Sequence, residues 1–204
     1  MKLYFAPGAC SLSPHIVLHE LGLDAQTVQV DLGAKTIAGG GDFREVNAKG
    51  YVPVLELDDG TRLTEGPAIV QYLADRKPEA GLAPANGTIQ RYQLQEWLNF
   101  ISTELHKQFS PLFNPQMPDS VKEQQRQRLQ GRFDYLAGIL SRQDYLMGAN
   151  FSVADAYLFT VLTWPAYIGM DLAPWPALQA YLQRVSQRPA VAATLAAERS
   201  AKKG

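Results

Sequence analysis

The sequence predicts two parts of different secondary structure, a small α/β sheet followed by an all-helical region. Short apolar or alternating runs, which are typical of strands, occur only within the first 64 residues. A stretch rich in Pro, Gly and Ala follows and is typical of a linker. Beyond it, apolar residues recur at steps of three and four, as in amphipathic helices. We therefore expect an α/β domain at residues 1–78, a linker at 79–87 and a helical domain at 88–204.

The first part is expected to contain four strands, two helices and, between the second and third strands, a loop or short helix. Ser13 and Pro14 favour a helix start, as N-cap and first helical residue, and Gly22 favours the helix end. A right-handed crossover makes the first two strands parallel, and the turn at Asp58-Asp59-Gly60 makes the last two antiparallel. The main elements, in order, are strand 3–5, helix 15–21, strand 27–31, strand 52–57, strand 62–64 and helix 67–76.

The second part is expected to be helical throughout. Residues 153–164 are apolar nearly all round, which predicts a central buried helix. Ser152 and Asp155 have the spacing of a capping box before this helix, and we interpret them as structural. Further helices are expected at residues 121–140, 175–188 and 189–198. A long first helix carries an apolar stripe formed by Leu94, Trp97, Leu98, Ile101, Leu105 and Phe109.

Composition excludes several classes of function. The chain has 204 residues, of which 46% are hydrophobic, an ordinary fraction for a globular protein with a real core. A net charge of -1 and the lack of a basic run argue against a nucleic-acid surface. No stretch approaches the roughly 18 apolar residues that span a membrane, and Pro7 and Gly8 interrupt any signal peptide. One cysteine excludes an intrachain disulfide, so we expect a cytoplasmic protein.

Cys10 is the first candidate for chemistry. It lies where the first strand runs into the first helix. Unpaired backbone N–H groups and the helix dipole at such a position favour the thiolate and lower the pKa of a thiol. The alternative is a small apolar side chain in a packed turn, because free cysteines are usually buried and inert. This segment alone leaves both interpretations open.

Two loops of the first part offer groups for a ligand. Glu65 and Gly66 precede a helix, where they can hold an amine and a carboxylate, or can simply cap the helix. A cis bond between Val52 and Pro53 would turn the Val52 main chain outward, toward an extended peptide. The residues alone favour a trans bond, because only about 5–6% of X–Pro bonds are cis.

A polar stripe on the long helix is a further candidate for a site. Its members share one face of the helix at steps of four, three and four, with Lys107 beside them. A solvated helix face is the alternative. His15 and His19 are spaced for a metal, but no third ligand accompanies them, so we expect no metal site. The stripe consists of Asn99, Thr103, His106 and Ser110.

Taken together and in order, several motifs resemble those of bacterial glutathione S-transferases of the beta class. The similarity runs from Met1 to about Arg199. It implies a thioredoxin-like N-terminal domain, an all-helical C-terminal domain, a cis bond before Pro53 and a homodimer. The motifs are Pro7-Gly8-Ala9-Cys10-Ser11, Asn47-Ala48-Lys49-Gly50-Tyr51-Val52-Pro53-Val54-Leu55, Leu63-Thr64-Glu65-Gly66-Pro67-Ala68-Ile69, Glu104-Leu105-His106-Lys107 and Phe151-Ser152-Val153-Ala154-Asp155-Ala156-Tyr157.

The resemblance also implies a site for glutathione, as a co-substrate and with no tightly bound cofactor. By it, Cys10 meets the glutathione sulfur and Val52 pairs with the cysteinyl backbone. Glu65 and Gly66 hold the γ-glutamyl end, and Lys35 attracts the glycyl carboxylate. The implied glutathione-binding residues are Ala9, Cys10, Lys35, Val52, Pro53, Glu65, Gly66, Asn99, Thr103, His106 and Lys107. The implied catalytic residues are Cys10 and His106, and the walls of the electrophile pocket are Phe109, Phe113, Trp164 and Tyr167.

The implied function is transfer of glutathione thiolate onto a small hydrophobic electrophile, aromatic or halogenated, in detoxification. Dehalogenation is included in this expectation. Two alternatives stay open. The Cys-x-x-Ser spacing of Cys10 and Ser13 suggests a monothiol glutathione-dependent oxidoreductase, in which a second glutathione releases the adduct. The other is a non-catalytic interaction or ligand-carrier protein on the same scaffold.

Overall fold

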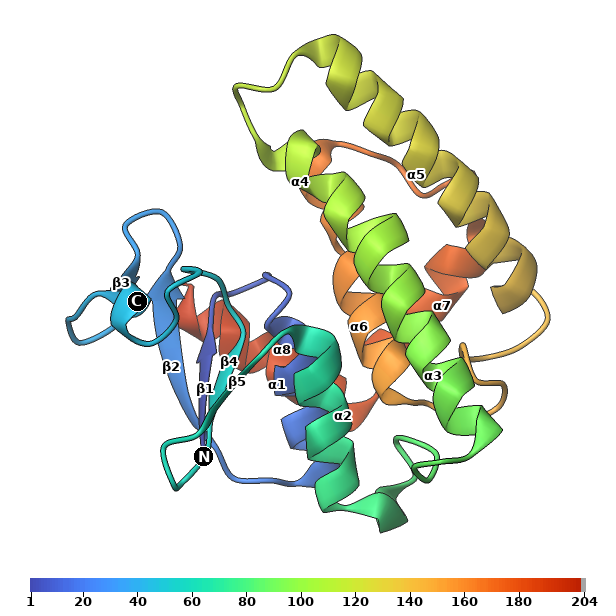
Figure 1. Cartoon of the computed structure of the whole chain (residues 1–204). Coiled ribbons are helices and arrows are strands. Elements are labelled where there is room, and N and C mark those ends of the chain that lie inside the picture. Colours follow the sequence, from blue (N-terminus) through green and yellow to red (C-terminus); the bar gives the residue numbers. More distant parts are fainter. Residues whose placement is uncertain (203–204) are drawn as a thin grey trace. The chain divides into compact units, whose positions relative to one another are not determined.

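The computed structural model describes residues 1–202, which form two compact units (Figure 1). The first unit extends from Met1 to Gly81 and includes the described residues from 187 to 202, and the second is Leu82–Ser186. We expected every residue after 88 to belong to the helical domain. The structure instead groups the last helix, α8 (Pro189–Ala201), with α1 (Leu12–Leu21) of the first unit. No helix within residues 1–202 is long and apolar enough to cross a membrane.

A five-stranded sheet in the order β3-β2-β1-β4-β5 forms the centre of the first unit (Figure 1). β1 pairs in parallel with β2, and β4 pairs antiparallel with both β1 and β5, which confirms the predicted directions. The short β3 was not predicted, because two residues are too few to show alternation. The strands are β1 (Lys2–Phe5), β2 (Gln26–Asp31), β3 (Thr36–Ile37), β4 (Val54–Glu56) and β5 (Arg62–Thr64).

Successive residues of β1 face opposite sides of the sheet. The ring of Phe5 lies 5.4 Å from that of His15 in α1, on the side that the helices cover. The ring of Tyr4 lies 5.9 Å from that of Phe43, in a short 3-10 helix (Phe43–Glu45) on the other side. On the helical side, α1 contacts both α2 (Gly66–Arg76) and α8. Both faces of the sheet are therefore covered.

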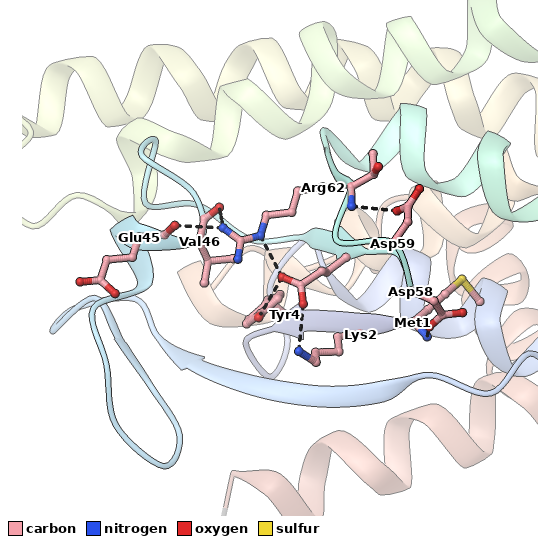
Figure 2. Close-up of polar contacts among 10 residues, drawn as sticks. Met1, Lys2, Tyr4, Glu45, Val46, Asp58, Asp59 and Arg62 are labelled. Atoms are coloured by element: carbon pink, nitrogen blue, oxygen red, sulfur yellow. Dashed lines mark hydrogen bonds and ion pairs between the residues drawn. The ribbon is translucent and has the colours of Figure 1, made fainter.

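Glu56 at the end of β4 joins Lys2 of β1 to Arg62 of β5, both of which are labelled in Figure 2. Lys2 of β1 donates to its Oε1 at 2.9 Å, and Arg62 of β5 donates to its Oε2 at 2.8 Å. These bonds lower the pKa of the Glu56 carboxyl, first through Lys2 and then through Arg62. Arg62 also donates to the main-chain carbonyls of Glu45 and Val46, at 2.9 and 3.2 Å. The network fixes the positions of β1, β4, β5 and the 3-10 helix relative to one another.

The start of α1 differs from the prediction. The helix begins at Leu12, so Ser13 is not its N-cap and Pro14 lies within the first turn. The missing N–H of a proline is tolerated there, because the first N–H groups of a helix have no partner within it. Ser11 occupies the N-cap position, but its hydroxyl bonds the N–H and carbonyl of Ala6 at 3.1 and 3.2 Å.

The second unit is all-helical, as predicted. The expected long helix is divided by a π-helical segment, in which the Lys107 N–H donates to the Ser102 carbonyl, five residues back. All ten residues of α6 are buried, which confirms the predicted central helix. The elements are α3 (Ile89–Phe100), the π segment (Ile101–His106), α4 (Lys107–Phe113), α5 (Asp119–Leu140), α6 (Val153–Leu162), a 3-10 helix (Trp164–Ile168) and α7 (Pro176–Ser186).

The predicted capping box begins α6. The N–H and hydroxyl of Ser152 donate to Oδ2 of Asp155 at 2.9 and 2.8 Å. The Leu146 N–H and the Tyr181 hydroxyl donate to Oδ1, at 2.8 and 3.1 Å. Although these bonds favour the carboxylate, burial dominates and raises the pKa of Asp155 to about 6. The cap therefore also joins α6 to α7 and to the loop before it.

Candidate functional site

Cys10 lies in the turn between β1 and α1, two residues before the helix begins. Its Sγ donates to the main-chain carbonyl of Val52 at 3.2 Å, and the thiol is partly exposed. The bond between Val52 and Pro53 is cis, as the resemblance implies. The structure thus places a thiol beside a helix N-terminus and brings it together with the loop that precedes β4.

The loop that precedes Cys10 is attached to the last helix. The Gly8 N–H donates to Oε2 of Glu198 at 2.8 Å, and Nδ1 of His15 lies 3.0 Å from Oε1. His15 and Glu198 are both buried. Nδ1 of His19 lies 2.6 Å from the Thr194 hydroxyl, and burial lowers the pKa of His19. Both histidines that have metal-ligand spacing are therefore engaged with α8.

Glu65 occupies the N-cap position of α2, but its side chain does not cap the helix. Its backbone is left-handed, with φ 68°, and its side chain makes no capping hydrogen bond. The carboxylate is 72% exposed, and Nζ of Lys49 lies 2.6 Å from Oε1. Lys49 also donates to the Thr64 hydroxyl at 3.0 Å. The carboxylate therefore faces an ammonium group rather than the helix, and Gly66 begins the helix beside it.

Lys35 presents an ammonium group near the loop that leads to Val52. Its Nζ donates to the Gly50 carbonyl at 2.9 Å and lies 5.6 Å from the ring centroid of Tyr51. The backbone of Lys35 is also left-handed, with φ 59°. A cation held by a carbonyl and an aromatic ring remains able to bind a carboxylate. The first unit thus contains the carboxylate of Glu65 and the ammonium group of Lys35, each of which can bind a group of the opposite charge.

The polar stripe of the helical unit spans the π segment. Asn99 and Thr103 are exposed, and the Thr103 hydroxyl donates back to the Asn99 carbonyl at 3.0 Å. Lys107 is exposed, whereas His106 is partly buried. Each π turn takes up more residues than an α turn, so the predicted α-helical spacing of this stripe does not continue through it.

An aromatic cluster surrounds Trp164, which directly follows α6. The ring of His106 lies 4.7 Å from that of Trp164, in an edge-on arrangement. The rings of Phe109 and Phe113 lie 5.5 and 5.8 Å from that of Trp164, and 6.0 Å from each other. Tyr167, the fourth predicted wall, is 61% exposed and makes no ring contact within residues 1–202. The structure therefore brings three of the four predicted wall residues together.

Three residues that the sequence analysis left without a role contact predicted site residues or the loop before Cys10. Tyr157 lies with its hydroxyl 2.6 Å from Nδ1 of His106. Lys49 contacts Glu65, and Glu198 holds the loop before Cys10. A phenol in an otherwise apolar buried helix needs a polar partner, so Tyr157 could have been singled out from the pattern. Nothing in the local sequence identifies the partners of Lys49 and Glu198.

Comparison with known proteins assigns the family. The chain matches the family models "Glutathione S-transferase, N-terminal domain" over residues 8–76 and "Glutathione S-transferase, C-terminal domain" over residues 100–189. It is 47% identical over 198 residues to Glutathione S-transferase GstA of Escherichia coli O157:H7, with 97% of this chain and 98% of that protein covered.

Solved structures agree with this assignment. A ternary complex of BphK, a bacterial glutathione S-transferase, is 60% identical, with a TM-score of 0.96 and coverage of 97% and 99%. The beta-class enzyme of Sphingomonas chungbukensis is 47% identical, with a TM-score of 0.94 and coverage of 97% and 98%. The predicted fold class, a thioredoxin-like domain followed by an all-helical domain, is confirmed. The chain belongs to the glutathione S-transferase family, among the bacterial beta-class enzymes.

Proposed function

We propose that this glutathione S-transferase acts on small aromatic electrophiles, halogenated ones included, in detoxification. The carrying observation is the aromatic cluster of Phe109, Phe113 and Trp164 beside His106. Phe113 is 47% exposed, an unusual amount of apolar ring surface to leave in contact with solvent. Aromatic rings stack on one another in offset or edge-on geometry, so such a surface favours a planar apolar substrate.

The proposed reaction is a nucleophilic substitution. The sulfur of glutathione forms a bond to the electrophilic carbon, and a halide leaves with the electron pair of the bond that breaks. The thiol proton passes to solvent. A free thiol has a pKa of about 8.5, so only a few per cent is ionised at neutral pH. We assign stabilisation of the thiolate to Cys10 and His106, whose S–H and ring N–H groups are hydrogen-bond donors.

The proposed glutathione-binding groups of the first unit match the charges of the tripeptide. We assign the α-amino group to Glu65, because its carboxylate already holds an ammonium group and does not cap α2. We assign the glycyl carboxylate to Lys35 and the γ-glutamyl carboxylate to the N–H of Gly66 at the start of α2. The further assigned residues are Ala9, Val52 and Pro53, and in the helical unit Asn99, Thr103 and Lys107.

Calorimetric titration of the reduced protein with glutathione tests these assignments. We expect saturable binding of one glutathione per chain, and about tenfold weaker binding by Glu65→Ala, which loses one charge-assisted hydrogen bond. Glu79→Ala removes an exposed carboxylate of the same unit and serves as the matched control. Equal affinities of Glu65→Ala and Glu79→Ala would rule out the assigned role of Glu65.

Steady-state kinetics with an aromatic and an aliphatic halide tests the electrophile class. We expect Phe113→Ala to raise KM for the aromatic substrate about tenfold, and to leave KM for glutathione within about twofold. Tyr135→Ala also removes an exposed ring of the helical unit, but from a separate cluster with Trp97 and Phe100, and is the matched control. An aliphatic halide that reacts as well as the aromatic one would contradict the proposal.

The two alternatives are not favoured, because the relatives at 47% and 60% identity, each of which matches 97% of the chain, are glutathione S-transferases. We further propose a homodimer, as the resemblance implies. In support, Ile89 and Tyr92 lie one turn apart on α3 and are 66% and 59% exposed, which is unusual for large apolar side chains. Light scattering coupled to size-exclusion chromatography tests this proposal. A cytoplasmic location stays a prediction from the single cysteine.

A further inference from the structure

A buried phenol contacts the imidazole of His106. The Tyr157 hydroxyl lies 2.6 Å from Nδ1, and the two rings meet edge-on with centroids 5.9 Å apart. A phenol O–H is a good donor but its oxygen is a poor acceptor, whereas the unprotonated nitrogen of a neutral imidazole is a strong acceptor. The favoured bond therefore runs from the Tyr157 hydroxyl to Nδ1, and the ring proton of neutral His106 lies on Nε2.

We propose that Tyr157 is a positioning residue for His106, whose imidazole it holds as the Nε2–H tautomer. The inference rests on the proposed function, in which His106 assists the glutathione thiolate. With Nδ1 occupied by Tyr157, Nε2 is the ring atom that donates to an anionic sulfur. In the other tautomer, Nε2 would present a lone pair to the thiolate and repel it.

The surroundings of both residues fix this geometry. Tyr157 is 2% exposed and lies on α6, whose start the capping box at Asp155 sets two residues earlier. His106 ends the π segment, and Trp164 packs edge-on against its ring at 4.7 Å. A rigid helix, a second aromatic ring and a short hydrogen bond thus act on one imidazole. Enzymes commonly orient a histidine in this way, through packing and hydrogen bonds from residues that do not themselves contact the substrate.

Tyr157→Phe tests the proposal, because it keeps the ring and removes only the hydroxyl. Long-range 1H–15N correlation spectra of the reduced, ligand-free protein report the tautomer of each imidazole, and His106→Ala assigns the signals. We expect Nε2–H alone in the wild type and a mixture of tautomers in Tyr157→Phe. We also expect kcat/KM to fall about tenfold, the effect of one hydrogen bond to a charged group.

Two controls separate positioning from stability and from the proposed function. Thr160→Val removes another buried hydroxyl of α6, which bonds the Ala156 carbonyl and not His106, so it should leave tautomer and kcat/KM unchanged. Tyr157→Phe combined with His106→Ala should be no less active than His106→Ala alone, because in this proposal the hydroxyl affects the reaction through the imidazole.

The outcomes are distinct. An unchanged His106 tautomer in Tyr157→Phe overturns the proposal. So does a changed tautomer with kcat/KM within twofold of the wild type, where His106→Ala is impaired. If His106→Ala retains full activity, the catalytic role of His106 fails instead, and the tautomer shift alone decides whether Tyr157 positions the ring.

Discussion

Removal of the Glu198 carboxylate should destabilise the protein by about 4 kcal/mol. Glu198→Ala deprives two donors of their acceptor, the partly buried Gly8 N–H at 2.8 Å and the buried Nδ1 of His15 at 3.0 Å. Hydrogen bonds to a charged group contribute about 1.5–3 kcal/mol each. Two such bonds contribute about 3–6 kcal/mol, and we take about 4 kcal/mol because the Gly8 N–H is only partly buried.

Thermal unfolding at a fixed protein concentration measures the effect. A chain of this size loses about 2–4 °C of Tm per kcal/mol, so we expect a fall of about 8–16 °C. Arg199→Ala, an exposed neighbour on the same helix, is the matched control and should stay within about 0.5 kcal/mol of the wild type. A change in Glu198→Ala below about 1 kcal/mol would refute the reasoning, because it would mean that water satisfies both donors.

Two further predictions concern Asp155 and Lys49. Because burial raises the pKa of Asp155 to about 6 from the model-compound 3.8, the folded protein binds this proton more tightly than the unfolded chain does. The stability advantage of the wild type over Asp155→Asn should therefore be full below pH 4 and fall by about 3 kcal/mol as the pH rises through 6; urea unfolding that shows a rise instead would contradict this. Lys49 holds the carboxylate that we assign to the glutathione amine, so Lys49→Met should lower KM for glutathione about twofold, the effect of one exposed ion pair. A higher KM would show that Lys49 assists binding instead.

Elements that depend on local patterns were predictable. The turn at Asp58-Asp59-Gly60 and its flanking residues predicted β5 at its observed bounds, because a tight turn fixes where the next strand begins. The capping box before α6 was predicted for a similar reason, since both of its partners lie within four residues. The candidate wall residues Phe109, Phe113 and Trp164 meet in the structure, but no local pattern predicted that they would.

Features that depend on contacts between distant residues were not predictable. The start of α1 was misplaced because the Ser11 hydroxyl bonds Ala6, whereas the pattern of Ser13 and Pro14 is also that of a helix start. The π segment reflects a change in hydrogen-bond register that residue types do not specify. The partner of Tyr157 lies 51 positions away, and that of Glu198 up to 190. Periodicity cannot reveal pairs at such separations.

The assignment of α8 to the first unit has a consequence for synthesis. The helical unit, Leu82–Ser186, is a continuous stretch of chain, whereas the first unit needs Glu198 from the far end to satisfy Gly8 and His15. A ribosome adds about 5–20 residues per second, so Glu198 is synthesised on the order of ten seconds after Gly8 and His15. The part made first is thus completed last, and any chaperone that assists this chain should act mainly on its N-terminal sheet.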